Sequence, residues 1–92
     1  MMEELLRKIT QMRVDKGWDK SDTPEILAKS VFAEAGELLE CYLSEHPDLD
    51  AVKSELADVL MYTLSLCSDL GLDPAEVVES KFIDIDRRYP SK

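Results

Sequence analysis

The 92-residue chain is poor in basic residues and contains no long apolar run. Eleven Lys and Arg residues stand against 20 Asp and Glu residues, for a formal net charge of −9. Non-specific nucleic-acid binding needs a basic face, so this charge argues against nucleic acid as a partner. No apolar stretch approaches the roughly 20 residues that cross a bilayer, and the charged start of the chain does not resemble a signal peptide. We therefore expect a cytoplasmic protein that binds no membrane.

Cysteine, glycine and proline are also scarce. The two cysteines, Cys41 and Cys67, form no CxxC or Cys/His pattern, so zinc is not expected and both should be reduced thiols. The three glycines and four prolines fall mainly at expected turns and helix ends, and the segments between them show no strand-like alternation of apolar and polar residues. These features predict an all-α chain with a single domain over residues 1–92. A core of this size is marginal alone, so we expect an oligomer.

Apolar periodicity predicts a bundle of four to five helices. The helices are expected over residues 3–16, from 24 to about 44, from 48 or 50 to about 70, and from about 74 to 88. Gly17 should end the first helix. Thr23 should cap the second, with Pro24 at its first position, and Asp73-Pro74 should open the last one in the same way. The segment from Trp18 to Thr23 is expected to connect the first two helices.

Two acidic pairs lie on consecutive predicted helices. Glu34 and Glu37 are three residues apart, and so are Glu55 and Asp58. Residues with this spacing share a helix face. Two helices packed side by side would therefore bring four carboxylates to one place, where they repel one another unless a cation lies among them. A site made only of oxygen ligands suits Mg²⁺ or Mn²⁺ better than zinc.

Helical geometry places these acids on inward-facing surfaces. Glu34 falls about 20° from Leu27, at the edge of the apolar arc of its helix, whereas Glu40 lies well outside it. That arc also contains Phe32, Leu39 and Tyr42, which are therefore expected to be buried. The other acidic pair belongs to a narrow polar stripe, within about 40° of one line, on a helix that is otherwise mostly apolar. This stripe comprises Glu55, Asp58, Tyr62, Ser65 and Asp69. Burying unpaired carboxylates costs several kcal/mol each, which a metal ion would offset. The alternative is chance spacing on a wet, acidic surface.

At these residues the chain resembles the MazG-like, all-α nucleoside triphosphate pyrophosphohydrolases. Their pattern is E-E-x-x-E, a spacer and E-x-x-D. The matching segments are Ala33-Glu34-Ala35-Gly36-Glu37, Glu55-Leu56-Ala57-Asp58, Gln11-Met12-Arg13, Asp15-Lys16-Gly17-Trp18-Asp19, Thr23-Pro24, Lys81 and Arg88-Tyr89-Pro90. The resemblance implies a Mg²⁺-dependent enzyme, with Mn²⁺ as an alternative, that cleaves a (deoxy)nucleoside triphosphate between the α and β phosphates. The products are a nucleoside monophosphate and pyrophosphate, as in nucleotide-pool housekeeping. A homodimer or tetramer is expected.

The same resemblance implies roles for eight residues. Glu34, Glu37, Glu55 and Asp58 would bind the metal, and Glu34 or Glu37 would help to activate water. The substrate would meet Trp18, Tyr62, Lys81 and Arg88. Each of these four has a plainer interpretation: Trp18 as an apolar clasp, Tyr62 as a core residue with a satisfied hydroxyl, and the two cations as solvated residues favoured by the helix dipole.

The chain departs from the family pattern in two places. Ala33 replaces the first glutamate of E-E-x-x-E, and Ile85 replaces an asparagine that is frequent in the family. Asp84 and Asp86 are also unusual there, which puts the nucleotide contacts of the last helix in question. Two alternative functions stay open: hydrolysis of phosphoribosyl-ATP, and a non-catalytic helical interaction module.

Overall fold

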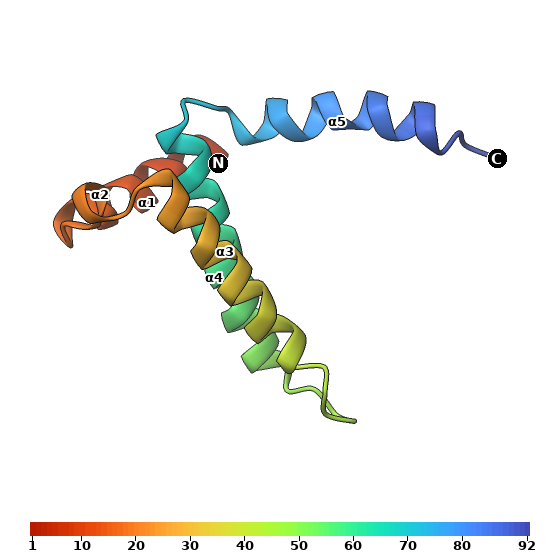
Figure 1. Ribbon diagram of the computed structural model, residues 1–92, viewed down its shortest axis with the longest axis horizontal. Helices are drawn as coiled ribbons and strands as arrows, with labels where there is room; N and C mark the ends of the chain where they lie inside the picture. The colour runs from red at the N-terminus through yellow and green to blue at the C-terminus, as the bar shows by residue number, and fades with distance from the viewer.

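A computed structural model describes all 92 residues and shows five α-helices and no strand (Figure 1). The predicted all-α class is confirmed. The helices are α1 (Met2–Asp15), α2 (Trp18–Ser21), α3 (Pro24–Glu40), α4 (Leu49–Asp69) and α5 (Pro74–Arg88). None of the five helices contains an apolar stretch that could span a bilayer. Both cysteines are free thiols.

The helix starts follow the capping residues that the sequence predicts. The hydroxyl of Thr23 accepts a hydrogen bond from the Ile26 N–H at 3.3 Å, with Pro24 at the first helical position. Asp48, rather than Asp50, caps α4, because its carboxylate accepts the Asp50 N–H at 3.0 Å. Asp73 caps α5 through the Ala75 N–H at 3.0 Å. These bonds satisfy N–H groups that have no partner within their helix.

Two predicted boundaries are wrong. The segment after Gly17 forms the one-turn helix α2, which is too short to leave a periodic pattern in the sequence. The helix expected to reach residue 44 ends at Glu40, because the next residues turn more tightly. The N–H of Tyr42 bonds to the carbonyl of Leu39 at 2.9 Å, and that of Leu43 bonds to Glu40 at 3.1 Å. Such i→i+3 bonds close the end of an α-helix.

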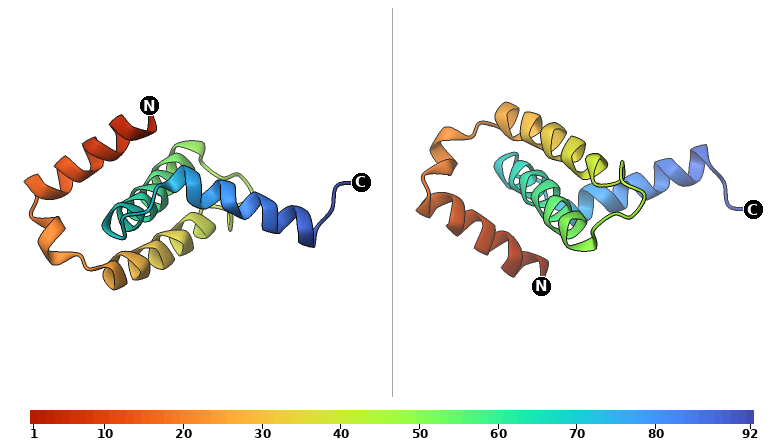
Figure 2. Two further views of the ribbon diagram at one scale, coloured as in Figure 1. Left: turned by 90° about the horizontal axis from the view of Figure 1, so that it is seen from above. Right: turned by 90° about the horizontal axis from the view of Figure 1, so that it is seen from below.

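Helix α4 is the central element. It runs antiparallel to α3, and α1 packs on its other side (Figure 2). The few buried side chains of the apolar core come from these three helices: Ile9, Leu27, Val52 and Leu64. Helix α5 leaves this group and projects away from it (Figure 1), with no extensive contact to the other helices.

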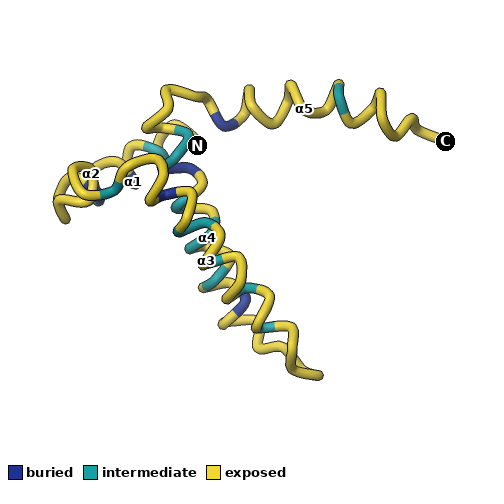
Figure 3. Tube along the Cα trace, viewed as in Figure 1, coloured by how far each residue is buried: buried dark blue, intermediate teal, exposed yellow.

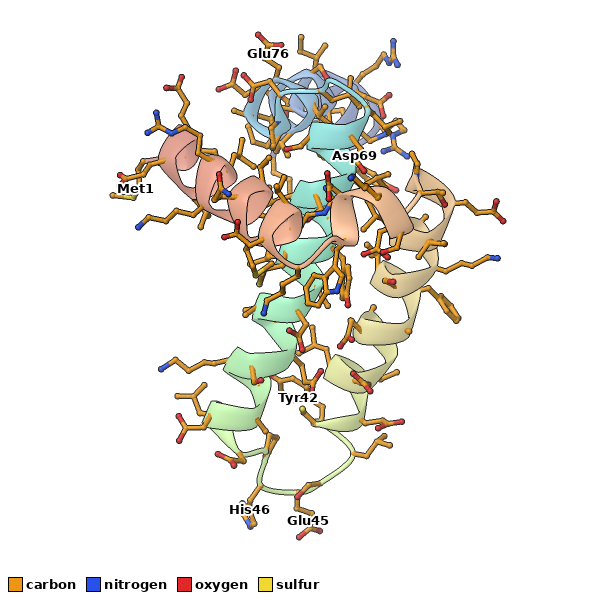
Figure 4. The ribbon with its side chains drawn as sticks, turned by 90° about the vertical axis from the view of Figure 1, so that its left-hand side faces the viewer. Met1, Tyr42, Glu45, His46, Asp69 and Glu76 are labelled. Atoms are coloured by element: carbon orange, nitrogen blue, oxygen red, sulfur yellow. The ribbon has the colours of Figure 1, made fainter.

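One ion pair fastens α1 to the end of α4. The Arg13 guanidinium donates two hydrogen bonds to the Asp69 carboxylate, at 3.0 and 3.1 Å. Figure 4 shows Asp69 at the end of α4 that α1 crosses, opposite the turn that contains His46. The Arg13 side chain is 6% exposed. Its pKa is raised, first by the hydrogen bond to Asp69, although burial opposes the shift.

We expect Arg13→Ala to lower the free energy of unfolding by about 2 kcal/mol, because it leaves a partly buried carboxylate unpaired. Urea unfolding at one fixed protein concentration measures this change. Lys8→Ala is the matched control, since Lys8 pairs with Glu4 on an exposed face at 3.9 Å. Its effect should stay below about 0.5 kcal/mol. Equal losses from the two variants would contradict a fastening role for Arg13.

Several apolar residues expected in the buried arc of α3 and the turn after it are exposed in the single chain. Phe32 is 83% exposed, Leu39 is 65% exposed and Tyr42 is 58% exposed. Figure 3 shows how little of the chain is buried, and α5 is almost entirely exposed. The prediction was wrong for the isolated chain, because α3 contacts a neighbour on only one side. Its second apolar side has no cover.

Candidate active site

Three of the four predicted metal ligands meet in the space between α3 and α4. Glu34 and Glu37 come from α3, and Glu55 comes from α4. One carboxylate oxygen from each lies within 4.8 Å of the others, a spacing that allows all three to reach one cation. The antiparallel pairing of the two helices produces this meeting, since the i, i+3 spacing alone unites only residues of one helix.

Two of these carboxylates hold an oxygen that is buried without a hydrogen-bond partner. The atoms are Oε2 of Glu34 and Oε2 of Glu55. Buried polar atoms in folded proteins are almost always paired, and an unpaired carboxylate oxygen is costly. A cation between α3 and α4 would supply the missing partner for both, so this donor set fits a hard divalent ion.

The crowding of the acids alters their protonation. The pKa of Glu34 is raised from 4.5 to about 7. The largest cause is a hydrogen bond to Glu37, which favours the protonated form, followed by burial and by the charges of Glu37 and Asp58. The pKa of Glu55 is also raised, first by burial and then by the charge of Glu37. Both groups therefore resist ionisation while no cation lies beside them.

This shift predicts how the stability of the metal-free protein depends on pH. Folding raises the Glu34 pKa, so its contribution to stability is fully present below about pH 4.5 and is lost as the pH rises through about 7. We expect wild type to lose stability relative to Glu34→Gln across that interval, measured by urea unfolding in chelator. Glu40→Gln, on the exposed face of α3, should keep the wild-type slope. Parallel pH profiles for wild type and Glu34→Gln would contradict the shift.

Asp58 lies beside the cluster rather than within it. It is absent from the group of oxygens that approach within 4.8 Å, yet its charge raises the pKa of both Glu34 and Glu55. It lines a neighbouring cavity of about 210 Å³ between α1, α2, α3 and α4. The cavity is lined by Met12, Arg13, Trp18, Asp22, Leu27, Asp58, Met61, Tyr62 and Ser65. The predicted polar stripe of α4 thus runs from the acid cluster along the cavity to Asp69.

Two predicted substrate residues border this cavity. Trp18 is the first residue of α2 and is 43% exposed. The ammonium group of Lys16 lies 5.6 Å from the centre of the Trp18 ring. Tyr62 is half-buried on α4. Its pKa is raised, first by burial and then by the charges of Glu34, Asp22 and Asp58. Its phenol therefore stays protonated and can donate a hydrogen bond into the cavity.

The other two predicted substrate residues lie elsewhere in the chain. Lys81 and Arg88 are on α5, and each pairs with Asp84 at 3.2 Å. Arg87 also pairs with Asp84, at 2.8 Å. Because α5 projects away from α3 and α4 (Figure 1), one chain does not bring these cations to its own acid cluster.

Arg13 and Asp22 line the cavity but are not among the predicted site residues. Arg13 lies on the buried face of α1. An arginine among the apolar residues of that face is unusual, and this position could have indicated a role in the site. Asp22 follows α2 directly, and its position depends on that turn of helix, which leaves no periodic pattern. The sequence therefore carried a signal for the first residue and none for the second.

Comparisons with known proteins identify the family and agree with the fold. The model of the MazG-like family matches residues 20–92. A crystal structure of a pyrophosphatase from Archaeoglobus fulgidus has a TM-score of 0.87 and 36% identity, over 98% of this chain and 93% of that one. The dCTP pyrophosphatase 1 of Bos taurus is 26% identical over 100 residues. That alignment covers 97% of this chain, which spans only 59% of the bovine protein.

Proposed function

Because the chain belongs to the MazG-like family, we propose that it hydrolyses a nucleoside triphosphate to a nucleoside monophosphate and pyrophosphate. The observation that carries this proposal is the cluster of Glu34, Glu37 and Glu55, with two buried oxygens that lack any partner. Such a cluster does not stabilise a helix pair, since apolar side chains at these positions would make the fold more stable. The names of the similar proteins support the same reaction class.

The cluster would hold Mg²⁺, or Mn²⁺ in its place. Glu34, Glu37 and Glu55 would bind the ion, and Asp58 would complete the acidic set from the cavity side. When bound, the ion neutralises charge on the phosphate oxygens, which the carboxylates alone would repel. These ligands offer only oxygen, as Mg²⁺ and Mn²⁺ prefer.

The remaining chemistry is assigned to the side chains. A carboxylate of Glu34 or Glu37 would accept a proton from the attacking water. The cavity beside Asp58 would hold the nucleoside, with Trp18 stacking on the base and the Tyr62 hydroxyl donating a hydrogen bond to sugar or phosphate. Its apolar walls, which include Met12, Leu27 and Met61, would exclude water from the base.

We expect Mg²⁺ or Mn²⁺ to raise the thermal unfolding temperature, because an ion that binds only the folded state stabilises it by mass action. At an ion concentration about 100 times its dissociation constant, the gain is about 2.7 kcal/mol. Glu55→Gln should abolish most of the shift. Glu40→Gln should keep it, since Glu40 lies outside the cluster. An unchanged melting temperature in wild type at millimolar metal would count against the metal site.

The direct test of the proposal is product analysis. Purified protein with Mg²⁺ is incubated with each common ribo- and deoxyribonucleoside triphosphate, and the products are separated. We expect equal amounts of monophosphate and pyrophosphate from at least one substrate. Release of orthophosphate instead would place the cut at another bond and overturn the assignment. A folded protein that cleaves none of them, and that ignores metal, would favour the non-catalytic interaction module.

We also propose that the protein acts as a homodimer or tetramer. Its radius of gyration is 15.6 Å, against about 12 Å for a compact chain of this length. Light scattering measures the mass directly, and a monomer at micromolar concentration would refute the proposal.

A further inference from the structure

Asp22 lines the cavity but makes no side-chain contact of its own. It borders the cavity next to Trp18 and Leu27 and is half-buried. Its carboxylate takes part in no ion pair and no side-chain hydrogen bond of the chain. Both of its oxygens are accessible, unlike the sealed oxygens of Glu34 and Glu55. Polar groups in folded proteins usually have a partner, so Asp22 is available to a ligand that enters the cavity.

The charge of Asp22 reaches two other walls of the cavity. The pKa of Tyr62 on α4 is raised first by burial and then by nearby carboxylates, Asp22 among them. The pKa of Arg13 on α1 is raised first by its hydrogen bond to Asp69, and the charge of Asp22 adds to this rise. Tyr62 and Arg13 both line the cavity. The carboxylate that follows α2 is therefore directed at the enclosed space rather than away from it.

Asp22 lies at the end of the cavity that is remote from the acid cluster. Helix α3 begins at Pro24, two residues after Asp22. It reaches Glu34 ten residues later, about 15 Å further along its axis. A nucleotide whose phosphates lie at the acid cluster would therefore direct its base toward Asp22 and Trp18.

A carboxylate with two free oxygens matches the edge of one base in particular. It offers two acceptors side by side and no donor. Guanine presents two neighbouring donors, N1–H and the 2-amino group, so both oxygens accept a hydrogen bond from it. Cytosine and adenine present an amino group beside a ring nitrogen that accepts, and uracil and thymine present one N–H between two carbonyl oxygens. Each of these four bases would place an acceptor against an oxygen of the carboxylate, which is repulsive.

We propose that Asp22 makes the cavity selective for guanine, so that GTP or dGTP is the preferred nucleoside triphosphate. This inference rests on the proposed function, which places the base of the substrate in the cavity. Stacking on Trp18 accepts any base, whereas the paired hydrogen bonds to Asp22 supply the choice. A plainer role for Asp22 is to place negative charge near the first turn of α3. That role would affect stability and leave the base preference unchanged.

The fluorescence of Trp18 measures base binding without catalysis. Trp18 is the only tryptophan of the chain and lines the cavity, so a base that stacks on it changes its emission. The protein with Mg²⁺ is titrated with GMP, inosine monophosphate, CMP, AMP and UMP. Inosine monophosphate is the sharpest comparison, because it differs from GMP only in lacking the 2-amino group.

We expect GMP to bind about 10-fold to 100-fold more tightly than inosine monophosphate, the usual effect of one hydrogen bond to a charged group. CMP, AMP and UMP should also bind more weakly than GMP. Equal affinities for GMP and inosine monophosphate would overturn the proposal. So would the absence of any fluorescence change with millimolar GMP.

Asp22→Asn tests the residue itself. Asparagine keeps the shape of the side chain but replaces one acceptor with a donor. The preference for GMP over inosine monophosphate should largely disappear, and AMP and CMP should gain relative to GMP, since an amide pairs with a neighbouring donor and acceptor. Asp19→Asn is the matched control, because Asp19 lies on the same helix but is exposed and does not line the cavity. It should keep the wild-type preference.

The outcomes distinguish a failure of guanine selection from a failure of the proposed function. An Asp22→Asn variant that folds by circular dichroism and keeps the wild-type preference overturns the role of Asp22. If that variant does not fold, the comparison of GMP with inosine monophosphate in wild type still decides. Wild type that releases pyrophosphate from GTP, dGTP and ITP at equal rates keeps the proposed function and loses the selectivity. If no triphosphate is cleaved, the proposed function fails, and the titration still shows whether the cavity selects guanine.

Discussion

Glu55→Gln is expected to reduce pyrophosphate release by about 100-fold to 1,000-fold, the range typical for removal of one strong electrostatic contact in an active site. The substitution keeps the shape of the side chain and removes its charge. It therefore deletes the only ligand that α4 contributes to the group of Glu34, Glu37 and Glu55. Steady-state kinetics with saturating metal and nucleotide measures the loss.

The stability of the same variant should change in the opposite direction. Without metal, burial and the carboxylates of Glu37 and Asp58 raise the pKa of Glu55, so the ionised form of Glu55 destabilises the folded protein. The uncharged amide that Glu55→Gln introduces removes that repulsion. We therefore expect the metal-free variant to unfold at an equal or higher denaturant concentration than wild type. Reduced activity together with retained stability separates a functional role from a structural one.

Glu40→Gln serves as the matched control for activity. Glu40 lies on the exposed side of α3, outside the acid cluster. It carries the same charge and undergoes the same chemical change. We expect its rate to stay within about twofold of wild type, as for surface substitutions away from special features. A comparable loss in both variants would point to a general charge effect and would count against Glu55 as a metal ligand.

Local sequence rules accounted for most of this fold and anticipated that Glu34, Glu37 and Glu55 would lie close together. Thr23, Asp48 and Asp73 cap the three longest helices as side-chain chemistry requires. The polar stripe of α4 was predicted to face the interior, since a narrow line of charged residues on an otherwise apolar helix is not a solvated surface. Each of these signals lies within one helix, where spacing and geometry are linked directly.

Features that depend on contacts between helices were harder to predict. The ion pair of Arg13 with Asp69 joins residues 56 positions apart, and no spacing rule relates them. Asp58 shares a helix face with Glu55 but lies outside the closest group of oxygens. Which of the two carboxylates approaches Glu34 and Glu37 depends on how α3 and α4 pack, and no spacing rule within one helix encodes that packing. The exposure of Phe32 has the same origin: its apolar character predicted burial, but α3 packs against α4 on one side only.

Phe82→Glu is expected to weaken self-association by at least about 1,000-fold. Phe82 shares one face of α5, an apolar stripe, with Val78, Ile85 and Tyr89. It is 58% exposed in the single chain. Losing a buried phenylalanine costs about 3–5 kcal/mol, and a symmetric pair suffers the loss twice. Sedimentation velocity over a dilution series measures the dissociation constant. The monomer fraction should rise at every concentration of the series, whereas wild type stays associated.

Ile83→Glu is the control that makes this result specific. Ile83 is the next residue, is 75% exposed, and undergoes the same type of substitution. It lies about 140° from Val78, away from the stripe. Simple loss of apolar surface would make the two variants behave alike, whereas packing through one face of α5 affects Phe82 alone. Dissociation by Ile83→Glu with an intact Phe82→Glu oligomer would mean that α5 meets its partner through the opposite face.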